Sequence, residues 1–375
     1  MPPRIVPPSE NGAEAYLRAL FFQTEMKLIR EITRKRGQGY VDYAEVAALE
    51  RVRRTLQKML NDSEEYVPLA IEHEFYTGAG AAAGYANARQ MFSAGQNRAI
   101  EILTDNLLGE ITEMAEVAYQ STASKLFLIG RLQSDIYRET ALEKSIEALA
   151  EGKGALTKVE EIIKATEEAG ITGFVDKAGH EWSMSSYGNM AMRTTVSQAQ
   201  TAAILTKDDE QDLYKIQPIG TTCPICAVYE GRVYSKSGTS PFYPPLSDAF
   251  GKIDPAGQNN IMNSFLNIHP NCLHSLTPYT EKGKTDKQIE KERRFSNPAT
   301  NPYNHDPRSK KQKAAYEEKE RKRAQYRNNV KQFQKYTQAG IPGFPKTFQT
   351  FEKHKLLDDE QYHKWLDAFR KRGKK

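Results

Sequence analysis

Thiols are scarce in this chain, and all of them lie in one short segment. Of 375 residues, only three are cysteine. They are Cys223, Cys226 and Cys272. No thiol precedes Cys223 and none follows Cys272, which excludes a disulfide framework spread over the chain. This segment is therefore the place where residue types and their spacing together suggest chemistry.

Long apolar runs are also missing. No run of about 18 apolar residues occurs, so the sequence predicts no membrane-spanning segment. The first residues, MPPRIVPPSENG, lack the apolar stretch of a secretory signal. We therefore expect the protein to be made in a reducing compartment, where its cysteines stay reduced. There a CxxC pair is more often a metal knuckle or a redox pair than a structural disulfide.

Proline is absent from a long central stretch. None occurs between Pro68 and Pro218, and this stretch is rich in Ala, Glu, Leu and Lys, which favours helices. Apolar residues recur at three- and four-residue spacing over 17–60, and Asp62 and the following serine are expected to restart the pattern. The sequence thus predicts a helical region over residues 1–169.

The character of the chain changes at Gly170. The segment GITGFVDKAGHEWSM has β-branched and aromatic residues on both sides of a KAG turn, which predicts a β-hairpin. Ser185 or Ser186 is expected to cap a helix after it. Further along, GRVYS and LHSLTPY predict short strands joined by a long loop, which is usually functional or anchored. We predict a small α+β domain over residues 170–281.

Charge is distributed unevenly. The net charge is +5, yet residues 284–375 contain 25 Lys and Arg against 12 Asp and Glu, an excess of 13 positive charges. The rest of the chain has 8 more acidic than basic residues. Such a tail either contacts a polyanion or an acidic surface, or is only a solvated helix. The stretch 309–338 is so polar that its helix should bridge solvent or pack on a partner.

An aromatic-rich segment closes the chain after residue 343. Leu356 and Leu357 are expected in its core, and Asp358 is expected to cap the last helix. The sequence therefore predicts an α+β fold that is predominantly α-helical. It comprises a helical N-terminal region, a small α+β domain with a Cys-rich knuckle, and a basic helical C-terminal tail over 282–375.

The cysteines have the spacing of half a zinc site. A CxxC turn, here Cys223 and Cys226, presents two thiolates to one tetrahedral metal. His269 and Cys272 form an HxxC that would complete a set of three cysteines and one histidine, with His274 as the alternative fourth ligand. Zn²⁺ suits soft thiolates plus imidazole best. Three reduced cysteines without metal remain the alternative, and a redox pair is disfavoured because no strand-to-helix context precedes the CxxC.

Catalytic motifs are missing. The sequence contains no GxSxG, no phosphate-binding loop and no readable Ser/His/Asp set. The EHEF segment lacks the full HExxH pattern of a zinc protease. We therefore predict no catalytic residue and no enzymatic activity.

Several segments together resemble one family. GTTCPICAVYEGRVYSKSGTSPFYPPLSDAFG and IHPNCLHSLTPYTE resemble phage minor capsid proteins of the minor capsid protein 2 type, which belong with the Mu F-like head-morphogenesis proteins. GITGFVDKAGHEWSMSSYGNMAMRTT resembles the stretch before the family's Cys region. PRSKKQKAAYEEKERKR and PKTFQTFEKHKLLDDEQYHKWLDAFR resemble its tail. The resemblance covers about 170–370, and Leu273 stands where the family usually has Arg.

The resemblance implies a virion component, made in the host cytoplasm and incorporated at low copy number during head morphogenesis. It implies a place in the capsid interior at the portal vertex, with the portal protein and the major capsid or scaffold proteins as partners. Cys223, Cys226, His269 and Cys272 match the family's TCxxC and HPNC positions. Some Mu F-like proteins carry an enzyme domain, so a nuclease or an ADP-ribosyltransferase-like toxin is one alternative. A zinc-knuckle nucleic-acid-binding protein is another.

Packaged DNA is the further partner that this placement implies. A basic tail suits sequence-independent, salt-sensitive contacts with DNA phosphates. No recognition helix or aromatic-lined groove indicates that bases are read. The cations expected near DNA are Lys310, Lys311, Lys313, Arg321, Lys322, Arg323 and Arg327.

Overall fold

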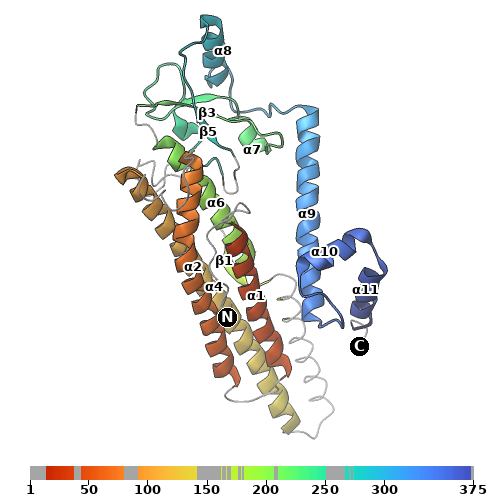
Figure 1. Ribbon diagram of the computed structural model, residues 1–375. Coiled ribbons are helices and arrows are strands. Elements are labelled where there is room, and N and C mark those ends of the chain that lie inside the picture. The colour runs from red at the N-terminus through yellow and green to blue at the C-terminus, as the bar shows by residue number, and fades with distance from the viewer. Residues whose placement is uncertain are drawn as a thin grey trace. The chain divides into compact units, whose positions relative to one another are not determined.

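The described part of the protein is mainly helical and carries two small antiparallel sheets (Figure 1). This confirms the predicted fold class. The computed structural model describes residues 14–37, 44–79, 92–141, 162, 166, 170–175, 179, 181–206, 210–250, 267–269, 272 and 274–372. None of its described helices is long and apolar enough to cross a membrane.

Contacts group the chain into two compact units. The first takes Met1–Ala19, Asn61–Thr112 and Gly188–Lys319. The second takes Leu20–Leu60, Glu113–Tyr187 and Glu320–Lys375. Several long helices contribute residues to both units, and each unit is described by itself below.

Three long helices make up most of the N-terminal region that is described. They are α1 (Glu14–Gly37), α2 (Ala44–Ala79) and α4 (Ala94–Ala141). The apolar stripes predicted from the sequence are buried in the interior. In α1 the stripe consists of Leu17, Phe21, Leu28 and Ile32.

The predicted interruption at Asp62 is wrong, because α2 continues through this residue and even contains Pro68. The residues around it form one buried stripe: Met59, Ser63, Tyr66, Val67 and Ala70. Burial of that stripe outweighs the weak local preference of Asp and Ser for turns.

A β-hairpin precedes α6, as the sequence predicts. Strands β1 (Thr172–Val175) and β2 (Glu181–Ser183) pair antiparallel, and α6 (Met184–Leu205) follows at once. The helix begins earlier than expected, since Ser183 rather than Ser185 or Ser186 caps it: the Ser186 amide donates to Ser183 Oγ at 3.3 Å.

A buried carboxylate holds the hairpin and α6 against α1. Glu25 is 1% exposed, and it accepts hydrogen bonds from the amides of Ile171 at 2.8 Å and Ser185 at 3.3 Å, as well as from the Ser185 hydroxyl. Gly170, at φ 85°, makes the approach possible because a side chain there would collide with the carboxylate. Glu25 therefore satisfies helix N-terminal donors from a distant part of the sequence.

The second sheet has three strands. β3 (Leu213–Ile216) lies between β4 (Val233–Ser235) and β5 (Leu276–Pro278), and both pairings are antiparallel. The two outer strands confirm the prediction, whereas the central strand was missed. A short 3-10 helix, η1 (Leu246–Asp248), lies in the loop that follows β4.

Four helices follow the sheet. They are α8 (Asp286–Ser296), α9 (Lys310–Gln338), α10 (Phe348–Leu357) and α11 (Glu360–Arg372). The end of α9 packs with the last two helices around an apolar core made of Phe333, Tyr336, Ile341, Phe351 and Trp365. The polar α9 thus has an apolar end that packs within its own chain.

Two details of this C-terminal part differ from the prediction. Leu356 and Leu357 are 67% and 65% exposed, so they lie outside the aromatic core. Asp358 does not cap α11: it ends α10 in a left-handed conformation at φ 48°. Its neighbour Asp359 takes the capping role and accepts from the Tyr362 amide at 3.0 Å.

Candidate metal centre

The CxxC forms a tight knuckle at the start of the short helix α7 (Pro224–Ala227). Cys223 is the N-cap, and its Sγ accepts a hydrogen bond from the Cys226 amide at 3.3 Å. Pro224 suits the first helical position because its fixed φ is helical and no amide is needed there. The knuckle turns the two sulfur atoms toward the same side, as a shared metal requires.

A second turn brings the other half of the cluster. The Cys272 amide donates to the His269 carbonyl at 3.0 Å, which closes the HxxC segment. Cys272 and His274 are 2% and 3% exposed. Strand β5 begins two residues after His274, so its pairing with β3 fixes this histidine relative to the knuckle.

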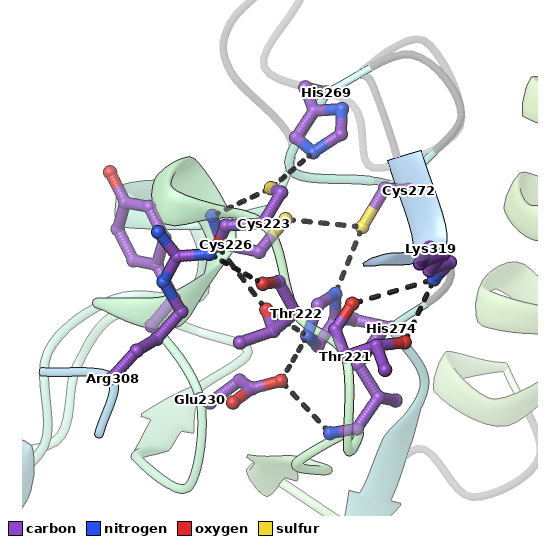
Figure 2. A network of polar contacts seen from close by, with 12 residues as sticks. Thr221, Thr222, Cys223, Cys226, Glu230, His269, Cys272, His274, Arg308 and Lys319 are labelled. Atoms are coloured by element: carbon purple, nitrogen blue, oxygen red, sulfur yellow. Dashed lines mark hydrogen bonds and ion pairs between the residues drawn. The ribbon is translucent and has the colours of Figure 1, made fainter. Parts of the chain in front are cut away.

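The five side chains predicted from the sequence come together (Figure 2). They form two groups of possible ligands that share Cys226: one with Cys223 and His269, the other with Cys272 and His274, and the donor atoms within each group lie within 4.8 Å of one another. Cys223 Sγ is 3.2 Å from His269 Nε2, and Cys272 Sγ is 3.5 Å from His274 Nδ1. None of the three cysteines forms a disulfide.

The distances in the buried group fit a tetrahedral zinc ion. Two sulfur ligands at the usual zinc–sulfur distance should be about 3.8 Å apart, and a sulfur and an imidazole nitrogen about 3.5 Å. Cys226 Sγ and Cys272 Sγ are 3.8 Å apart, and Cys272 Sγ and His274 Nδ1 are 3.5 Å apart. The donor set therefore fits zinc both in chemistry and in spacing.

A carboxylate supports the second histidine. Glu230 Oε1 lies 2.6 Å from His274 Nε2 and also accepts from the Ile219 amide at 2.9 Å. Histidines that bind metals usually donate their other ring N–H to such a group, which fixes the tautomer and the ring orientation. His274 Nδ1 is thereby directed to the sulfur atoms.

The electrostatics of the cluster favour two thiolates. Hydrogen bonding from Cys226 lowers the pKa of Cys223 to about 3 against the opposing effect of burial, and His269 adds to the shift. Hydrogen bonding from Cys226, and then from His274, lowers the pKa of Cys272 to about 4. Hydrogen bonding with Cys223 and Cys272, together with burial, raises the pKa of Cys226, so this cysteine is the one that keeps its proton. Thiolate is the form that binds metals.

His274 is charged in this arrangement when no metal is bound. Burial lowers the pKa of His274, but its hydrogen bonds with Cys272 and Glu230 outweigh burial and raise the pKa to about 9. A metal ion would displace the proton on the Nδ1 side, because metal ligands must be deprotonated. Binding at this cluster is accordingly coupled to proton release.

The knuckle is also joined to α9 and to the segment that leads into it. Arg308 Nη1 donates to the Thr222 carbonyl at 3.0 Å, and Lys319 Nζ donates to Thr221 Oγ1 at 3.0 Å (Figure 2). Asp306 holds the Arg308 guanidinium through two hydrogen bonds of 2.9 Å. Two cations of the basic region therefore support the backbone just before Cys223.

The cations expected near DNA do not join this cluster; they lie along α9. Five of them are exposed, and the other two are half-buried and paired: Lys313 with Asp306 at 3.3 Å and Arg323 with Glu320 at 2.7 Å. The exposed ones are Lys310, Lys311, Arg321, Lys322 and Arg327.

Glu230, Thr222 and Arg308 were missed by sequence reasoning. None belongs to a recognisable motif, and Glu230 is 44 residues away from His274 in the sequence. Only the pairing of β3 with both β4 and β5 brings the two together. Leu273, which stands where the family usually has Arg, lies outside the described residues.

A family comparison agrees with this arrangement. The profile of phage minor capsid protein 2 matches residues 13–339. The chain belongs to the phage minor capsid protein 2 family. The matched part contains the whole cysteine and histidine cluster and all of α9, while α10 and α11 lie beyond it. No curated protein and no solved structure matches the chain.

Membership in the minor capsid protein 2 family confirms the resemblance that the sequence shows. It implies a virion component with partners in capsid assembly, and it indicates a structural role. Within that role, the cysteine and histidine cluster is suited to hold a fold together, because its donors come from two segments that are far apart in the chain.

Proposed function

We propose that this protein is a structural component of the phage head that acts during head morphogenesis at the portal vertex. It is incorporated at low copy number, has no catalytic role, and contacts the portal protein and the major capsid or scaffold proteins. Membership in the minor capsid protein 2 family is the observation that carries this proposal.

Charge supports a place in the capsid interior next to DNA. The acidic part of the chain, before residue 284, suits docking on protein, and the exposed cations of α9 suit contacts with DNA phosphates. We assign three regions accordingly: 1–169 engages the portal or capsid, 170–281 carries the metal centre, and 282–375 is the basic tail.

Zinc is the proposed structural metal. We assign as its ligands Cys226, Cys272 and His274 of the buried group, together with Cys223, which lies within 4.8 Å of Cys226 in the other group. Glu230 lies behind His274, and His269 lies beside Cys223. The 3.8 Å and 3.5 Å spacings within the buried group, and the carboxylate on His274 Nε2, favour His274 over His269 as the fourth ligand. Such a site fixes the knuckle to the segment before β5.

Co-expression with the portal protein of the same phage tests the assignment. A stable complex that elutes together on size-exclusion chromatography is expected, and it should persist when the seven α9 cations are replaced by Gln. A protein that elutes apart from both the portal and the major capsid protein would contradict the proposed place at the portal vertex.

A further inference from the structure

A basic pocket lies on the helical part of the second unit, far along the chain from the metal centre. Its volume is about 320 Å³. Three of its lining residues come from α1 and three from α2. They are Lys27, Arg30, Glu31, Arg51, Arg54 and Thr55.

Helical spacing explains why these side chains meet. On each helix, the lining positions are separated by three and four residues, so they form one row. The neighbouring rows are apolar and buried, with Ile32 on α1 and Leu56 on α2. Arg51 Nε then donates to Glu31 Oε2 at 2.8 Å and joins the two rows.

The pocket has a clear excess of positive charge. Four of its lining residues are cations and only Glu31 is acidic. That carboxylate is already used, since Arg51 binds it at 2.8 Å and Arg34 lies 3.9 Å from it. In the part of the chain that the structure describes, neither Lys27 nor Arg30 has an ion-pair partner.

This charge stands out against its surroundings. The chain before residue 284 has 8 more acidic than basic residues, yet these cations gather around one cavity. Like charges at this spacing repel one another. A hollow lined by one sign of charge concentrates ions of the opposite sign. The arrangement is therefore suited to an anion.

We propose that this pocket binds a phosphate group. Guanidinium groups match phosphate oxygens with paired hydrogen bonds, and Arg30 and Arg54 would supply them from opposite helices. Lys27, another lining residue, adds a compact positive charge. The phosphate is either a free ion or a phosphodiester of duplex DNA, and the two sources are separated by experiment.

Matched charge reversals in the full-length protein test the proposal. Arg30→Glu changes the pocket, and Arg98→Glu makes the same charge change at an exposed arginine of α4 that pairs with Glu101. Both variants are made in a background where the seven α9 cations are Gln, so that the tail does not mask the pocket. Circular dichroism checks the fold, and Lys27→Glu replaces Arg30→Glu if that variant does not fold.

Binding is measured with two probes. Inorganic phosphate is titrated by calorimetry, and a short duplex DNA is titrated by fluorescence anisotropy over a series of salt concentrations. Arg30→Glu should weaken binding about tenfold or more, the loss expected for one charge-assisted hydrogen bond. For DNA, it should also reduce the slope of log affinity against log salt by about 1.

The outcomes separate the possibilities. If Arg30→Glu weakens DNA binding and Arg98→Glu does not, the pocket binds the DNA backbone. If Arg30→Glu weakens only the binding of inorganic phosphate, the pocket binds a free ion. Equal behaviour of the two variants with both probes, or no binding of either probe by the background protein, overturns the proposal. A separate result tests the proposed role of the basic tail. If the α9 cations do not contact DNA, replacing them with Gln should leave the DNA affinity unchanged.

Discussion

Nε2 of His274 lies 2.6 Å from Oε1 of Glu230, and the two side chains are 2% and 9% exposed. This pair orients Nδ1 of the histidine toward Cys272, and on this ground we propose His274 rather than His269 as the histidine ligand of zinc. His269, on the other side of the cluster, contacts Cys223 instead.

His274→Ala should abolish stoichiometric zinc binding, whereas His269→Ala should retain it. The purified parent protein is expected to contain about one equivalent of zinc under reducing conditions, and His274→Ala less than about half, because structural zinc binds tightly only to a complete ligand set. Elemental analysis measures the content. Cobalt substitution would show the same difference in the visible spectrum. Zinc loss in His269→Ala with full retention in His274→Ala would reverse the assignment.

Glu230→Gln should weaken the metal site without removing it. Gln keeps an oxygen that accepts from His274 Nε2, but it lacks the charge that strengthens this bond. Loss of an outer carboxylate typically costs about 10- to 100-fold in metal affinity. Competition with a chelator of known affinity measures the change. Glu281→Gln is the matched control, since Glu281 pairs with Arg293 at 2.8 Å outside the cluster. An unchanged zinc affinity in Glu230→Gln would mean that Glu230 does not support the metal site.

Glu25→Gln should reduce the pH dependence of stability. Burial raises the pKa of Glu25 above its ordinary value of 4.5, although hydrogen bonds from Ser185 and Ile171 oppose the shift. A raised pKa in the folded state stabilises the protein at low pH, and this contribution is lost as the pH rises through the folded value. The unfolding free energy of the parent minus that of the variant should therefore be larger at pH 5 than at pH 8. Urea denaturation at both values measures it, and an equal difference would contradict the prediction.

Phe351→Ala should destabilise the C-terminal helices by about 3–5 kcal/mol, the usual cost of removing a buried aromatic ring. Phe351 is 0% exposed at the centre of the aromatic core. Leu356→Ala, at a position that is 67% exposed in the same helix, should change stability by less than about 0.5 kcal/mol. Hydrogen exchange of residues 341–372 measures the stability of this segment in each of the two variants. Similar exchange rates in both variants would mean that the aromatic core does not stabilise this segment.

Spacing in the sequence was enough to predict that these cysteines and histidines cluster, because CxxC and HxxC are local patterns that need only tight turns. It was not enough to choose between His269 and His274, since that choice depends on Glu230, which only the three-stranded sheet brings close. The central strand β3 was missed because Leu213–Ile216 is short and has no turn signal of its own. Local rules also failed at Asp62, where packing of a buried stripe decides the structure.

Asp358 and Asp359 show that local sequence also cannot decide which of two neighbouring residues caps a helix. The sequence predicted Asp358 as the cap of α11, but that residue ends α10 instead. The left-handed conformation at Asp358 leaves Asp359 to accept from the Tyr362 amide. Turn geometry between two helices is fixed by their packing, here around Phe351 and Trp365.

Quantitative mass spectrometry of purified particles tests the central claim most directly. We predict that the protein is present in both procapsids and mature virions, in far fewer copies than the major capsid protein. Its absence from both kinds of particle, with the protein detected in the infected cell, would contradict its assignment as a structural component of the phage head.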